Sequence, residues 1–90
     1  MKRAEILDTA KEYVTKDRAA THGKAEDSFA CIAEYWSVYT GKPISAYDVA
    51  VMMALFKVAR MQGNPTHLDS AVDACGYAAL AGEIAGRKPT

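Results

Sequence analysis

Apolar residues in this sequence recur every three or four positions, the spacing that places them on one face of an α-helix. Four segments carry this spacing: residues 2–15, 25–40, 45–62 and 67–85. No sustained alternation of apolar and polar residues and no hairpin dipeptide indicates a β-strand. We therefore expect an all-α chain, folded as a single four-helix bundle-like domain over residues 1–90 with a frayed tail at residues 86–90.

The third segment organises this expected fold. Between Val49 and Val58 it is apolar on almost every side, which is typical of a helix in the middle of a bundle. Ser45 followed by Asp48 predicts a capping box at its start. Gly41 is suited to the left-handed conformation that closes the preceding helix.

Composition narrows the class of protein. With 90 residues, 50% hydrophobic and 24% charged, the chain is an ordinary globular domain with a small core, so we expect a homo-oligomer that buries further surface. A net charge of zero without a basic run lacks the electrostatic footprint of a nucleic-acid-binding protein. The apolar runs are too short for a membrane span, and residues 1–15 lack the apolar stretch of a signal peptide, so we expect a cytoplasmic location.

Basic and aromatic residues predict a ligand site. Lys57 and Arg60 are neighbours on the third helix. They either bind a phosphate, with the lysine as a point charge and the arginine as a bidentate fork, or neutralise acids of the fourth helix. The loop after the first helix can close over an anion, and the second helix offers rings on which a base can stack. The residues expected to contact the ligand are Arg18, His22, Lys24, Tyr35, Tyr39, Lys57 and Arg60.

Acidic residues support a second interpretation. Asp69 and Asp73 are four residues apart and project from one face of the fourth helix, where they either hold Mg²⁺ or pair with basic side chains. With Asp48 they would form the catalytic acids of a Mg²⁺-dependent enzyme, because Mg²⁺ prefers hard oxygen ligands.

The elements DRAATHG, IAEYW, DVAVMMALFKVAR and HLDSAVDACGYAALAGEI resemble a small helical domain of uncharacterised function encoded by phages and prophages. The resemblance covers residues 6–84 and implies a viral protein in the cytoplasm of an infected or lysogenic bacterial cell. More distantly, the chain is similar to the all-α NTP pyrophosphohydrolases of the MazG type, which hold Mg²⁺ with an ExxE and an ExxD motif. Asp73 matches the last acid of the second motif, whereas Ser70 stands at its glutamate and no ExxE is present.

These observations lead to three hypotheses. The first is a phage protein that binds a phosphorylated nucleotide or a nucleotide-derived signal without a cofactor, and sequesters it, as an anti-defence protein would. The second is a Mg²⁺-dependent NTP pyrophosphohydrolase. The third is a protein-binding module that docks a host partner through the small residues of the fourth helix.

Overall fold

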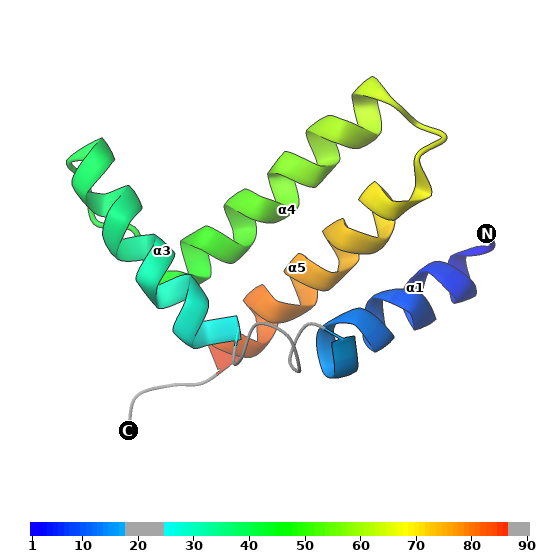
Figure 1. Ribbon diagram of the computed structural model, residues 1–90, viewed down its shortest axis with the longest axis horizontal. Helices are drawn as coiled ribbons and strands as arrows, with labels where there is room; N and C mark the ends of the chain where they lie inside the picture. The colour runs from blue at the N-terminus through cyan, green and yellow to red at the C-terminus, as the bar shows by residue number, and fades with distance from the viewer. Residues whose placement is uncertain (18–24, 87–90) are drawn as a thin grey trace.

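The computed structural model describes residues 1–17 and 25–86 and is all-helical there, which confirms the predicted fold class. The elements in order are α1 (Arg3–Glu12), the π-helical turn η1 (Tyr13–Asp17), α3 (Ala25–Thr40), α4 (Ala46–Gly63) and α5 (Leu68–Gly86). In Figure 1, α4 and α5 run antiparallel as a hairpin, α3 crosses the first half of α4, and α1 lies along α5. None of the described helices combines the length and apolar character that a bilayer crossing requires.

The first helix differs from its prediction at its end. The α-helical part stops at Glu12, and residues 13–17 continue as a wider π turn. The hydroxyl of Thr15 donates a hydrogen bond to the backbone carbonyl of Lys11. The same kind of hydrogen bond, from Thr9 to the carbonyl of Glu5, lies within the regular α-helix, so it does not by itself explain the change of winding.

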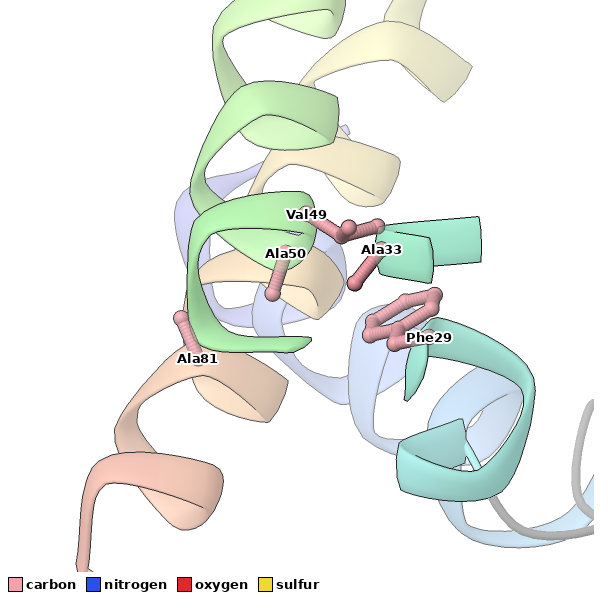
Figure 2. Packing of buried hydrophobic residues seen from close by; sticks show 5 residues of the cluster. All are labelled: Phe29, Ala33, Val49, Ala50 and Ala81. Carbon is pink, nitrogen blue, oxygen red and sulfur yellow. The ribbon is translucent and has the colours of Figure 1, made fainter. Parts of the chain in front are cut away.

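The core forms where α3, α4 and α5 meet. Phe29 and Ala33 of α3 pack with Val49 and Ala50 of α4 and with Ala81 of α5 (Figure 2). Val49 and Ala50 have no exposed surface. Four of these five side chains are alanine or valine, so the helices can approach one another closely.

Side-chain hydrogen bonds fix the connection from α3 to α4. The backbone N–H of Ile44 donates to Ser37 Oγ at 2.8 Å, and the same oxygen lies 3.2 Å from the carbonyl of Ile44. Gly41 adopts the expected left-handed conformation at φ 71°. Asp48 N–H donates to Ser45 Oγ at 3.1 Å and Ser45 N–H donates to Asp48 Oδ2 at 2.9 Å, which confirms the predicted capping box.

The predicted central position of α4 is wrong for the single chain. Its inner face is buried, but Leu55, Phe56 and Val58 on other faces are 61%, 49% and 50% exposed. The reason is that the main packing partners of α4 are α3 and α5, and both pack on its buried face. A helix that is apolar all round is therefore only half covered.

Two glycines of α5 give a matched test of this packing. A Cβ at Gly76 would lie 3.0 Å from Val14 Cγ1, whereas a Cβ at Gly82 would meet nothing within 4 Å. We expect Gly82→Ala to raise the free energy of unfolding by about 0.5–1 kcal/mol, because alanine favours a helix more than glycine does. The free energy of unfolding of Gly76→Ala should be at least about 1 kcal/mol lower than that of Gly82→Ala, since the new methyl group crowds Val14. Urea denaturation followed by circular dichroism measures both.

The control for this prediction is Val14→Ala. Combined with Gly76→Ala, it makes room for the added methyl group, so the difference between the two glycine positions should shrink. Equal stabilisation by both single substitutions would show that α5 and η1 are not in close contact.

Candidate functional site

The turn between α4 and α5 is held by its own hydrogen bonds. Asn64 N–H donates to the carbonyl of Arg60 at 2.9 Å, and His67 N–H donates to the carbonyl of Asn64 at 3.1 Å. The Thr66 hydroxyl donates to Asn64 Oδ1 at 3.2 Å. Pro65 occupies the second position of the turn, where its fixed φ is favourable. The last turn of α4 and the first turn of α5 are thereby set beside each other.

A hollow of about 310 Å³ opens at this end of the hairpin, lined by Arg60, Asn64, His67 and Ser70. Its volume is within the range of small-molecule sites. Arg60, Asn64 and His67 are exposed, while Ser70 is buried at its base with 2% of its surface accessible. The lining combines a permanent cation with amide, imidazole and hydroxyl groups, a set suited to the oxygens of an anion.

Arg60 is available for such a contact. No carboxylate within the described ranges forms an ion pair with it, and its guanidinium carbon lies 5.7 Å from the centre of the Phe56 ring. The N–H donors of a guanidinium that lies over an aromatic ring remain in the guanidinium plane. A phosphate can accept hydrogen bonds from two of them there. Arg60 therefore combines a supported position with free hydrogen-bond donors.

Lys57, the other predicted cation, has a different role in the structure. Its ammonium nitrogen lies 3.1 Å from Asp73 Oδ2, and the two side chains are only 20% and 14% exposed. This ion pair joins α4 to α5 across their contact. Of the two interpretations drawn from the sequence, the structural one describes Lys57, because its charge is balanced within the chain.

The three acids of the enzymatic hypothesis do not gather at one place. Asp48 closes the capping box at the start of α4, Asp73 pairs with Lys57, and Asp69 is an exposed residue in the first turn of α5. Among the side chains that the structure describes, those of residues 1–16 and 28–86, no group of three His, Cys, Asp or Glu residues is placed to hold a metal ion. These acid side chains thus do not fit a magnesium cage.

Two further predicted ligand contacts, Tyr35 and Tyr39, are not brought to the hollow. Tyr35 and Tyr39 are 72% and 91% exposed on α3, which packs on the first half of α4, whereas the hollow lies at the other end of that helix (Figure 1). From Val49 to Arg60 the helix rises about 16 Å. Arg18, His22 and Lys24 lie outside the described residues.

Sequence reasoning missed Asn64, His67 and Ser70 as members of a site. The spacing of apolar residues predicts a helix that begins at residue 67, and it gives no reason to join Asn64, His67 and Ser70 in one site. The available signal was the arginine in the last turn of one helix, followed across a short turn by several polar side chains. In a helical hairpin these residues must meet at the same end.

Comparison with known proteins places the chain among phage-encoded relatives. Residues 5–85 match the family described as a domain of unknown function, DUF6378. The chain is 42% identical over 76 residues to the Gene 55 protein of Mycobacterium phage L5, covering 83% of this chain and 49% of that protein. It is 40% identical over 73 residues to the Gene 55 protein of Mycobacterium phage D29, covering 81% and 48%.

The chain thus spans about half the length of the curated relatives it matches. No solved structure matches it.

The structural role of Lys57 can be tested by a double-mutant cycle with Asp73. We expect Lys57→Met to lower the free energy of unfolding by about 1–3 kcal/mol, because it removes a cation that lies 3.1 Å from a largely buried carboxylate. In a chain that already carries Asp73→Asn the same substitution should cost less, since the ion pair between the two side chains is already lost. Urea denaturation of the two single variants and the double variant gives the coupling free energy.

The exposed pair of Lys16 and Glu12, 3.2 Å apart with side chains 69% and 56% accessible, is the control. Lys16→Met should cost less than about 0.5 kcal/mol, because solvent screens that pair. A similarly small cost for Lys57→Met, with no coupling to Asp73, would contradict the assignment of Lys57 as a structural counter-ion.

Proposed function

The chain belongs to the DUF6378 family, and we propose that it binds a phosphorylated nucleotide or a nucleotide-derived signal in the hollow at the α4–α5 turn. The observation that carries this proposal is Arg60, a guanidinium without a carboxylate partner in the described part of the chain, at the edge of a hollow with other hydrogen-bonding side chains. A phosphate group accepts two parallel hydrogen bonds from such a fork.

Donors other than Arg60 complete the anion site. The Asn64 amide and the His67 imidazole line the same hollow, and Ser70 contributes a hydroxyl at its base. The helix α5 begins at Leu68, so its positive end lies at the same place and adds to the attraction of an anion. A hydrogen bond to a charged group contributes about 1.5–3 kcal/mol, so this set is sufficient for a phosphate-anchored ligand.

Phe56 supplies an aromatic surface beside the proposed phosphate contact. Its ring is 49% exposed and lies 5.7 Å from the guanidinium carbon of Arg60. A base attached to the bound phosphate can stack on that ring, which is the role that the sequence assigned to Tyr35 or Tyr39. A nucleotide fits this combination better than a bare anion, since both its charge and its ring find a partner.

The structure supports binding without cleavage. Hydrolysis of a nucleoside triphosphate needs a metal clamp on the phosphates, and Asp48, Asp69 and Asp73 are spread over a helix cap, an exposed turn and an ion pair. The proposal is therefore a protein that holds its ligand and removes it from solution. For a phage protein this action would deplete a nucleotide pool or a signal of host defence.

Calorimetry with the 90-residue chain tests the proposal. The panel comprises inorganic phosphate, nucleoside mono-, di- and triphosphates, ADP-ribose and cyclic dinucleotides. We expect at least one nucleotide to bind, and Arg60→Gln to weaken its binding by about 10-fold or more, because a charged hydrogen-bond donor is lost. Arg60→Lys should recover only part of the affinity, since an ammonium cannot form the bidentate contact.

The matched control is Arg3→Gln, which removes the same charge from an exposed position on α1 and should leave the affinity unchanged. The proposal fails if no member of the panel binds, or if Arg60→Gln and Arg3→Gln behave alike. Release of pyrophosphate from a nucleoside triphosphate with Mg²⁺, abolished by Asp73→Asn, would instead favour the hydrolase.

A further inference from the structure

The outer face of α4 is apolar and uncovered. We define this outer face by five exposed residues on the side of α4 opposite its buried residues, namely Tyr47, Met52, Leu55, Val58 and Ala59. Four of them are among the large hydrophobic residues with the most accessible surface, with exposed fractions of 43% for Tyr47, 41% for Met52, 61% for Leu55 and 50% for Val58. Met52, Leu55 and Val58 follow one another at intervals of three residues and Ala59 lies four residues after Leu55, so with Tyr47 near the start of the helix they form one stripe.

The charged residue in the middle of this helix points the other way. Lys57 faces inward, where it pairs with Asp73 of α5. The middle of α4 therefore has its charge on the side of α5, whereas Met52, Leu55 and Val58 are exposed on the outside. A helix whose outer side met only water would be expected to carry polar residues there.

We propose that the outer face of α4 is the interface of a symmetric homodimer, covered by the same face of a second copy of this chain. The only charge at this face is Asp48 at its N-terminal end, so two identical copies can meet along it in an arrangement that keeps like charges apart. An isologous contact requires this property, because each residue near the two-fold axis meets its own equivalent.

The sequence along the stripe favours an antiparallel arrangement of the two α4 helices. Asp48 lies at one end of the outer face and Gln62 at the other, seven residues on either side of Leu55. With the two-fold axis at Leu55, each Asp48 would lie beside Gln62 of the second copy. A parallel pair would instead set the two Asp48 carboxylates against each other. In an antiparallel pair the dipoles of the two helices also point in opposite directions, which is electrostatically favourable.

The area of the face is adequate for a dimer. With exposed fractions near one half on side chains of roughly 100–250 Å², the five residues and the exposed Asp48 and Gln62 at the two ends of the face present on the order of 500 Å² per copy. Two copies would bury about 1,000 Å² in total, which is the lower limit for a specific interface. Burial of this surface would also complete the core around α4, which the single chain leaves half covered.

The experiment is light scattering coupled to size exclusion for the 90-residue chain and two variants. We expect the unaltered chain to have the mass of a dimer. Leu55→Glu should reduce it to the mass of one chain, because two glutamates would meet at the axis, and circular dichroism should show an unchanged helix content. Val38→Glu is the matched control, since Val38 is 84% exposed on α3 outside the outer face, and this variant should remain a dimer.

Cross-linking gives a second readout that does not depend on weakening the dimer. With Cys31 and Cys75 replaced by serine, Leu55→Cys should form a disulfide between copies on oxidation, whereas Val38→Cys should not. A monomeric chain, or a dimer that Leu55→Glu leaves intact, would overturn the proposal. Dissociation by Val38→Glu alone would also overturn it by placing the interface on α3. The dimer and the nucleotide site are tested separately, because a monomeric Leu55→Glu variant should still bind a nucleotide if the proposed function is correct.

Discussion

The close pairing of α4 with α5 is the contact on which the rest of the molecule depends. It requires small side chains on α5, because Ala81 packs against Ala50 and Val49 on one side while Gly76 receives Val14 on the other. A larger residue at either position would push a neighbouring helix away, since packed interiors have little free volume. The hairpin of two long helices is therefore the frame to which α3 and α1 attach.

This pairing also decides what the charges do. Because α5 approaches α4 closely, Lys57 meets Asp73 across the contact and its charge is balanced inside the protein. Arg60 lies one turn further along, where the helices lead into the turn at Asn64, and no carboxylate in the described part of the chain pairs with it. Two cations three residues apart on one helix thus have different surroundings, which charge and spacing alone do not distinguish.

The fold could be predicted from the sequence because its signals are local. Helical spacing, the capping box of Ser45 and Asp48, and Gly41 at φ 71° each follow from a few neighbouring residues. The tertiary surroundings of α4 could not be predicted in this way. An all-round apolar helix indicates burial on every side, but it does not say whether the covering comes from the same chain or from a second one.

The candidate site was harder to predict for a related reason. The sequence identified Arg60 as an anion contact but grouped it with Lys57, with the tyrosines of α3 and with Arg18, His22 and Lys24, which lie outside the described residues. The structure shows that the tyrosines belong to the other end of α4 and that Asn64, His67 and Ser70 are the neighbours of Arg60. Which helix ends meet is a property of the whole topology, and it cannot be deduced from the spacing of residues along one helix.

The central claim is that the exposed end of the hairpin binds phosphate while the ion pair beside it is structural. The most direct test is a nuclear magnetic resonance titration of the isotopically labelled chain with a nucleotide that binds in solution. The account predicts that resonances of Arg60, Asn64, His67 and Ser70 shift with a common saturation curve, while those of Lys57 and Asp73 move little. Saturable shifts centred on Lys57 and Asp73, or on α3, would contradict it.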